Sequence, residues 1–257
     1  MTTTIYESLR DRVVIVTGGG QGLGRAYAHA LASQGAVPVI AEINIVAAQS
    51  VVEEIEGKGG RALAVETDVS DEGSTVAMAE STLSSMGRID CLINNAAHFS
   101  RITMAPFWEL SLLEWERAVN INVTGAFLCS KAVAPAMIES GWGRIVNVSS
   151  ATVISGRPNY LHYVTSKSAM IGMTRSMARE LGPHNVIVHL FWPGTIRTEI
   201  DRPSVSGDMF EEIAAAQALS RPATVDDFAA AVLFLCSDDS AYMTGQALVS
   251  NGGLAFP

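Results

Sequence analysis

The sequence alternates between short runs of apolar, β-branched residues and longer stretches in which apolar residues recur with helical spacing. Several short runs are apolar at nearly every position, which is typical of strands buried on both faces of a parallel sheet. This alternation constrains the fold more than any other feature of the chain. It predicts strands at residues 13–17, 37–41, 62–66, 89–94, 144–149, 186–191 and 247–250.

The longer stretches predict helices at residues 22–34, 45–56, 72–86, 112–139, 162–181 and 225–236. Because strands and helices alternate throughout, right-handed βαβ units should build a doubly wound α/β sheet of about seven strands with helices on both faces. The 257 residues suit a single domain spanning 1–257. Residues 194–208 lack clear periodicity, and we expect them to form a mobile lid together with the segment up to residue 218.

The composition argues against several classes of partner. The net charge is −9 and no cluster of lysines and arginines occurs, so nucleic-acid binding is not expected. Cys91, Cys129 and Cys236 lie singly in apolar runs and the five histidines show no ligand spacing, which predicts neither disulfides nor a metal. The first residues do not resemble a signal peptide, and the longest apolar run falls short of the roughly 20 residues of a membrane span. We therefore expect a cytoplasmic protein without membrane association.

A glycine-rich turn follows the first predicted strand and precedes the first predicted helix. Residues 17–24 read Thr-Gly-Gly-Gly-Gln-Gly-Leu-Gly, which is not the strict G-x-G-x-x-G pattern. Free amides and the helix dipole at a helix N-terminus attract a pyrophosphate, and glycine lets the backbone approach the phosphates closely. The turn therefore predicts a dinucleotide site, with a purely structural turn as the alternative.

Glu42 follows the second predicted strand, 20 residues after Gly22. A carboxylate at this position can accept hydrogen bonds from both adenosine ribose hydroxyls, and it repels a 2′-phosphate. Gln21 stands where a basic residue would favour NADP, and Arg25 lies further along the predicted helix. These residues predict NAD as the cofactor. The alternative is that Glu42 is a solvated strand end.

Tyr163 and Lys167 share one face of a predicted helix at i and i+4. A nearby ammonium favours the phenolate and should lower the pKa of Tyr163. Ser150 follows a predicted strand at the sheet edge that binds ligands, where its hydroxyl could bond a substrate oxygen; Ser149 is the competing candidate. Asn122 is an isolated polar residue in an apolar helical stretch, and it could equally be a polar residue on a helix surface.

Together these residues resemble the short-chain dehydrogenase/reductase (SDR) family, and the likeness extends over almost the whole chain. It is greatest to the family's NAD-dependent secondary-alcohol dehydrogenases and 3-oxoacyl reductases. Residues 17–24 are similar to the family's T-G-x-x-x-G-x-G, and residues 94–97 (Asn-Asn-Ala-Ala) to its N-N-A-G. The other matching stretches are Asp68 with Val69, Asn122, Ser150 with Tyr163 and Lys167, and residues 193–198, which match P-G-x-x-x-T. Ala97 departs from the pattern, because the family usually has glycine there.

The resemblance implies a Rossmann-type fold and a role for each matching residue. Tyr163 would exchange the hydroxyl proton, Lys167 would lower its pKa and hold the nicotinamide ribose, and Ser150 would steady the substrate oxygen. Asn122 would anchor a water that links Lys167 to solvent. A homotetramer or homodimer is also implied. The implied cofactor-binding residues are Gly18, Gln21, Gly22, Leu23, Gly24, Glu42, Asp68, Val69, Asn95, Ala96, Tyr163, Lys167, Pro193, Gly194, Ile196 and Thr198.

The predicted function is therefore NAD-dependent interconversion of a secondary alcohol and a ketone. Residues expected near the substrate are mostly apolar or aromatic and favour a hydrophobic substrate with a cyclic or aromatic body; they are His98, Phe99, Val153, Ile154, Tyr160 and Trp192. Nothing in the sequence directs Arg101, Arg157 or Arg202 inwards. Two alternatives stay open, an NADP-dependent 3-oxoacyl-type ketoreductase and a non-enzymatic dinucleotide sensor. The aromatic set could also serve only to pack the lid and subunit contacts.

Overall fold

The computed structural model describes residues 4–201, 204–205 and 208–257, and its centre is a seven-stranded sheet. The strand order is β3-β2-β1-β4-β5-β6-β7, and the recorded strand pairs are all parallel. This confirms the predicted doubly wound α/β fold. The strands are β1 Val13–Thr17, β2 Val37–Glu42, β3 Leu63–Glu66, β4 Cys91–Asn94, β5 Gly143–Val148, β6 Val186–Pro193 and β7 Ala247–Ser250.

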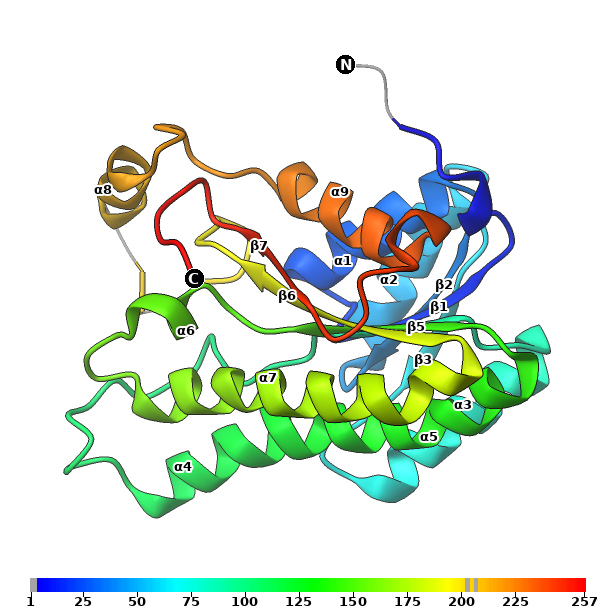
Figure 1. Cartoon of the computed structure of the whole chain (residues 1–257), viewed down its shortest axis with the longest axis horizontal. Helices are drawn as coiled ribbons and strands as arrows, with labels where there is room; N and C mark the ends of the chain where they lie inside the picture. Colours follow the sequence, from blue (N-terminus) through cyan, green and yellow to red (C-terminus); the bar gives the residue numbers. More distant parts are fainter. Residues whose placement is uncertain (1–3, 202–203, 206–207) are drawn as a thin grey trace.

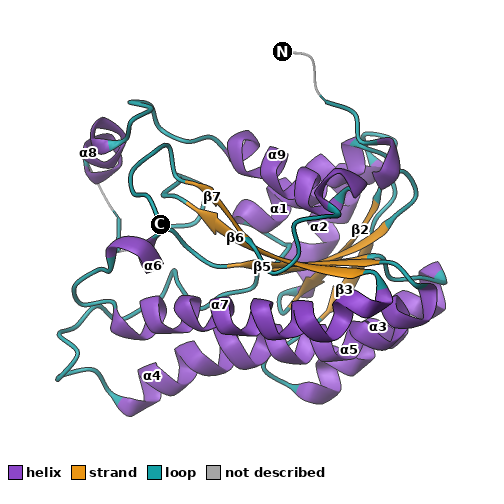
Figure 2. Cartoon of the chain, viewed as in Figure 1, coloured by secondary structure: helices purple, strands orange, loops and turns teal. Residues whose placement is uncertain are grey.

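Helices cover both faces of the sheet (Figures 1 and 2). The helices are α1 Gly22–Ser33, α2 Ile45–Glu56, α3 Glu72–Met86, α4 Leu112–Val119, α5 Gly125–Ser140, α6 Thr152–Ser155, α7 Leu161–Leu181, α8 Met209–Ala216 and α9 Val225–Cys236. Helices α1, α2 and α9 lie on one face, and α3, α4, α5 and α7 lie on the other. Short turns of 3-10 helix and a π-helical turn complete the described elements.

Successive residues of the central strands enter two different apolar cores. Val14 and Val16 of β1 pack with Phe228 of α9, whereas Val13 and Ile15 pack with the α5 side of the sheet. Side chains alternate between the two faces of a strand, and both faces here are covered by helices. The strand is therefore apolar at every position from Val13 to Val16, as the sequence pattern predicted.

The predicted helix at 112–139 is not one regular helix. Helices α4 and α5 are joined by a π-helical turn, Asn120–Thr124, which contains Asn122. A π-turn inserts an extra residue into the helix and so turns the following residues to a new face. Measured as one stretch, Leu112–Ser140 is long and apolar enough to cross a membrane by length and composition. Its side chains Leu128, Cys129 and Val133 are buried in the protein, as in the core helix of a folded domain.

Several predicted boundaries shift by one or two residues. Strand β4 begins at Cys91 and not at 89, β3 begins at Leu63 and not at 62, and β6 continues to Pro193. Strand β5 ends at Val148, so Ser149 and Ser150 lie beyond its carboxyl end. In the predicted lid, Ile196 forms an isolated parallel bridge with Ala223, and α8 covers part of the segment after residue 208. Arg202, Pro203 and Gly207 lie outside the described residues.

Candidate active site

A cavity of about 390 Å³ lies at the carboxyl ends of the central strands. The strand order reverses between β1 and β4, and ligands of doubly wound sheets bind at this switch point. Of the predicted catalytic residues, Ser150, Tyr163 and Lys167 line the cavity, whereas Asn122 is outside the lining and contacts Ser166 on α7. Gly22 and Gly24 belong to the glycine turn but not to the lining. The other predicted cofactor residues line it: Gly18, Gln21, Leu23, Glu42, Asp68, Val69, Asn95, Ala96, Tyr163, Lys167, Pro193, Gly194, Ile196 and Thr198.

The glycine turn packs so closely that side chains cannot be added to it. Gly18 and Gly22 have φ of +62° and +57°, which disfavours any other residue. A Cβ on Gly24 would lie 2.2 Å from the carbonyl oxygen of Gly18. The glycines are therefore required by the tight packing of the turn, which brings Gly18, Gln21 and Leu23 to the cavity at the start of α1. A helix N-terminus at this position fits the pyrophosphate of a dinucleotide.

Hydrogen bonds tie this turn to the segment after β4. The Thr17 hydroxyl accepts from the amides of Asn95 and Ala96 at 3.0 Å each, and the Asn95 side chain donates to the carbonyls of Thr17 and Gly18. The residues that match the family's N-N-A-G pattern therefore fix the shape of the turn.

Glu42 lines the cavity where β2 ends, and it holds a fixed position there. It ends β2, is 8% exposed, and accepts hydrogen bonds from the amides of Gly20 at 3.2 Å and Asn44 at 3.3 Å. Its carboxylate is buried and is held by backbone amides, so the alternative of a solvated strand end is wrong. Arg25 forms two 2.9 Å hydrogen bonds with Glu54, so a carboxylate already neutralises this guanidinium.

The lid contributes an unexpected carboxylate to the glycine turn. The amide of Gly22 donates to Oε1 of Glu199 at 2.9 Å, and Arg25 lies 3.8 Å from the same oxygen. The carboxylate therefore lies at the amide where an anionic phosphate is expected to bind. Sequence reasoning missed Glu199, because 177 residues separate it from Gly22 and no local pattern indicates the contact.

Tyr163 and Lys167 lie one turn apart on α7. The Lys167 ammonium is 5.9 Å from the centre of the Tyr163 ring, and it donates to the Val148 carbonyl at 2.8 Å. Burial lowers the pKa of Lys167 to about 8. At neutral pH the group still carries most of its charge, so a cation stands beside the phenol.

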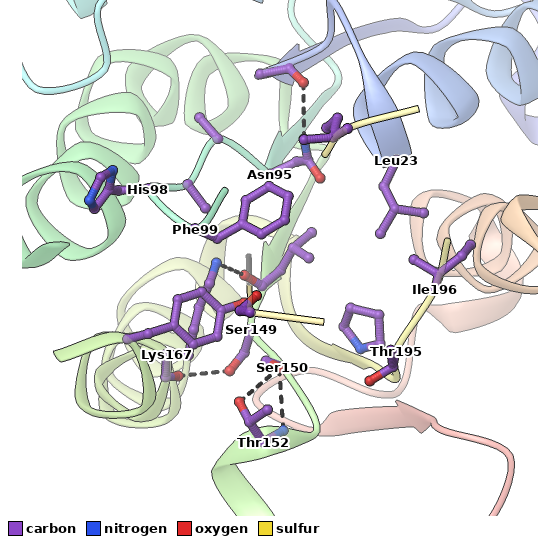
Figure 3. Close-up of a pocket in the computed structure, with 18 of the residues that line it drawn as sticks. Leu23, Asn95, His98, Phe99, Ser149, Ser150, Thr152, Lys167, Thr195 and Ile196 are labelled. Carbon is purple, nitrogen blue, oxygen red and sulfur yellow. Dashed lines mark hydrogen bonds between the residues drawn. The ribbon is translucent and has the colours of Figure 1, made fainter. Parts of the chain in front are cut away.

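The two serines after β5 have different roles in the hydrogen-bond network. The Ser149 hydroxyl donates to the Lys167 carbonyl at 2.7 Å, so its proton is already used. Ser150 accepts from the amide and hydroxyl of Thr152, at 3.3 and 2.9 Å (Figure 3). The Ser150 proton can therefore be donated to an oxygen in the cavity, which favours Ser150 over Ser149.

Asn122 is buried and connects two parts of the site. Its Oδ1 accepts from the His98 amide at 2.7 Å, and its Nδ2 donates to the Ser166 hydroxyl at 2.9 Å. Ser166 in turn donates to the Tyr163 carbonyl at 2.8 Å. The alternative of a polar residue on the helix surface is wrong. Asn122 instead joins the segment after β4 to the helical turn that carries Tyr163.

The substrate end of the cavity differs in part from the prediction. Phe99 and Tyr160 line it as expected, and Figure 3 shows the Phe99 ring extending into the cavity while the His98 ring turns away from it. Val153, Ile154 and Trp192 were expected here, but they pack together in a separate apolar cluster. The reason is that α6 has a single turn, whose apolar residues face strand β6.

Arg157 also lines the cavity, although nothing in its local sequence directs it there. Its guanidinium donates to the Ser204 carbonyl and lies 4.8 Å from the centre of the Tyr160 ring. Arg101 is exposed and outside the lining. Sequence reasoning missed Arg157 because its hydrogen bond with Ser204 depends on how the loop after α6 meets the lid.

Comparisons with known proteins agree with this geometry. The family model described as Enoyl-(Acyl carrier protein) reductase matches residues 18–255. A 3-oxoacyl-acyl-carrier-protein reductase of Aquifex aeolicus is 37% identical, covering 96% of this chain and 98% of that protein. A protein named as a galactose dehydrogenase, from Rhizobium meliloti, is 35% identical, covering 97% of each.

A solved structure is similar as well. The crystal structure of a protein described as a short-chain alcohol dehydrogenase, from Sinorhizobium meliloti, has a TM-score of 0.91 at 30% identity and covers 97% of this chain and 98% of that one. Fold and cavity thus define an oxidoreductase that acts on alcohols or ketones with a nicotinamide dinucleotide. The chain belongs to the short-chain dehydrogenase/reductase family.

Proposed function

We propose that this protein is an NAD-dependent oxidoreductase that interconverts a secondary alcohol and a ketone, with Tyr163 as the acid/base. The observation that carries the proposal is that Tyr163, Lys167 and Ser150 line the same cavity as the glycine turn and Glu42. A site for proton transfer and a site for a dinucleotide are therefore continuous.

The chain's own residues would move and hold the proton. The bound nicotinamide supplies or accepts the hydride. During oxidation the Tyr163 oxygen takes the hydroxyl proton, and during reduction it returns it. The Lys167 ammonium stabilises the phenolate, and Ser150 donates to the substrate oxygen. Asn122 positions the turn of α7 that carries Tyr163, and we expect it also to hold the water that connects Lys167 with solvent.

Glu42 supports NAD over NADP. Its buried carboxylate faces the adenosine end, where it would repel a 2′-phosphate. The described lining residues at that end include no arginine or lysine to pair with such a phosphate. The competing proposal is an NADP-dependent 3-oxoacyl reductase. It is supported by the similarity to the Aquifex aeolicus protein, which is named as a 3-oxoacyl reductase. A dinucleotide sensor is disfavoured, because a sensor does not need a phenol beside an ammonium.

Apolar surface at the substrate end supports a substrate with a hydrophobic, cyclic or aromatic body. Phe99, Tyr160, Val205 and Leu254 supply this surface. One relative is named for a sugar and another for a carrier-bound acyl chain, so the lining is the better guide.

A rate screen over secondary alcohols and ketones, with NAD and with NADP, tests the proposal. We expect turnover of compounds with an apolar body and a higher kcat/KM with NAD, followed by the absorbance of reduced nicotinamide. Turnover restricted to NADP and carrier-bound acyl chains would favour the competing reductase. Dinucleotide binding without turnover of any alcohol or ketone would favour the sensor.

We also propose a homotetramer or homodimer in the cytoplasm. Large apolar side chains in the loop before α4 and at its start are exposed, among them Trp108 at 72% and Leu113 at 72%. Such a patch is typical of a surface that a partner subunit covers. Cys91, Cys129 and Cys236 are buried free thiols, which suits a reducing compartment.

A further inference from the structure

The charges that line the cavity are divided between its two ends. The carboxylates among the described lining residues are Glu42, which ends β2, and Asp68, which follows β3; both lie at the proposed adenosine end. At the substrate end, the charged lining residues within the described chain are Lys167 and Arg157, and both are cations. In a protein with a net charge of −9, this end therefore has a local excess of positive charge.

Arg157 lies against the Tyr160 ring, which in turn contacts the Tyr163 ring. Its guanidinium lies 4.8 Å from the centre of the Tyr160 ring, and that ring lies 4.9 Å from the centre of the Tyr163 ring at an angle of 43°. Tyr160 is buried, so it offers the guanidinium a fixed surface. The cation is thus separated from the acid/base by a single aromatic ring.

The charge of Arg157 is not neutralised by a carboxylate. Its one recorded hydrogen bond goes to the Ser204 carbonyl, and the ion pairs found within the described residues do not include it. By contrast, Arg25 near the glycine turn pairs with Glu54. A guanidinium has five N–H donors in a planar fork, so Arg157 keeps donors for an anion in the cavity.

We propose that Arg157 determines specificity by binding a carboxylate of the substrate while Tyr163 acts on the carbinol or carbonyl carbon. This inference rests on the proposed function and names its substrate class: a hydroxy acid or oxo acid with an apolar body. A carboxylate fits better than a phosphate, because a phosphate dianion calls for more cationic donors than one guanidinium beside Lys167. Only the Tyr160 ring separates Arg157 from Tyr163, so the carboxylate would lie close to the reacting carbon. A free acid fits this short distance better than a substrate attached to the long arm of a carrier.

Matched pairs of substrates test the proposal. Secondary hydroxy acids and their methyl esters share a carbon skeleton and differ in charge, so their kcat/KM ratio isolates the contribution of the carboxylate. We expect the wild-type protein to favour the acids at least tenfold. Arg157→Met should lose that preference, mainly through a higher KM for the acids, so that its acid-to-ester ratio of kcat/KM falls towards one. Arg157→Lys should retain part of it, and Arg101→Met, at an exposed site outside the lining, should retain all of it.

A binding experiment keeps the proposal testable without turnover. In the complex with NADH, a hydroxy acid should raise the melting temperature of the wild-type protein more than its ester does, and this difference should vanish in Arg157→Met. Unchanged NADH affinity shows that the variant is folded. Equal acid-to-ester ratios in wild type and Arg157→Met would overturn the role of Arg157. Turnover of uncharged alcohols alone would overturn it as well, while leaving the proposed function in place.

Discussion

At the scale of single residues, Glu42 should determine the choice of dinucleotide. Glu42→Gln removes the charge that repels a 2′-phosphate but keeps a hydrogen-bonding side chain. We expect the ratio of kcat/KM for NAD to that for NADP to fall at least tenfold, because the repulsion acts only on NADP. The measurement is initial rates with both dinucleotides.

Glu66 offers a matched control for this experiment. It pairs with Glu42 in the register of β2 and β3, but it is exposed and does not line the cavity. Glu66→Gln should leave the ratio unchanged. A wild-type enzyme that uses both dinucleotides equally well would contradict the role of Glu42.

His189 should make the folded state sensitive to acid. It is fully buried, Ser240 lies 3.1 Å from its Nε2, and burial lowers its pKa to about 4. The unfolded chain takes up this proton near the ordinary pKa, so stability is complete above that value and is lost as the pH falls towards the lowered one. Between pH ~7.5 and ~5 we expect a loss of about 2 kcal/mol from this group.

Urea unfolding of His189→Asn at both pH values checks this expectation. Asparagine keeps a polar group for Ser240 but does not titrate, so the loss between the two pH values should shrink. His184→Asn, at an exposed position, should behave like the wild type. The same loss in wild type and His189→Asn would show that other groups control the acid sensitivity.

At the scale of the elements, the lid should compete with the dinucleotide. The Glu199 carboxylate accepts the hydrogen bond of the Gly22 amide. A pyrophosphate that binds this amide must displace the carboxylate, and the two negative charges repel each other. Glu199→Gln should therefore bind NADH several-fold more tightly, as measured by fluorescence titration. Asp201→Asn, on the exposed neighbouring residue, should have little effect. Weaker binding in Glu199→Gln would mean that the carboxylate assists the bound state.

The elements also show what the sequence could and could not predict. Strand β1 is buried on both faces and is therefore apolar from Val13 to Val16, so its bounds were predicted to the residue. The bounds of β7 were also predicted to the residue, although this strand lies at the sheet edge and is only partly buried. The π-turn that contains Asn122 was not predicted, because none of its five residues is a glycine or proline. Asn122 instead forms hydrogen bonds with His98 and Ser166, which come from other segments of the chain.

The candidate site divides in the same way. Motifs with fixed local spacing predicted Tyr163, Lys167, Ser150 and the glycine turn. They did not predict Arg157 and Glu199, since their hydrogen-bond partners lie 47 and 177 residues away in the sequence. Contacts of this kind are set by how two loops meet, and no local pattern encodes them.

At the scale of the whole molecule, the exposed apolar surface at the start of α4 should mediate assembly. Leu113→Glu places a charge on that surface and should reduce the mass measured by light scattering towards that of the monomer. Val46→Glu, on the equally exposed surface of α2 across the sheet, is the matched control and should leave the mass unchanged. A wild-type protein that is already monomeric would contradict the proposed assembly.

The most direct test of the account compares Tyr163→Phe with Tyr242→Phe in turnover under saturating dinucleotide. Tyr163→Phe removes only the hydroxyl that is expected to transfer the proton, and Tyr242 is fully exposed. We predict that Tyr163→Phe keeps its affinity for NADH and loses roughly 10²-fold or more in kcat, because general acid–base catalysis contributes about that much. Tyr242→Phe should match the wild type. Undiminished turnover in Tyr163→Phe would contradict the central claim that this phenol is the acid/base.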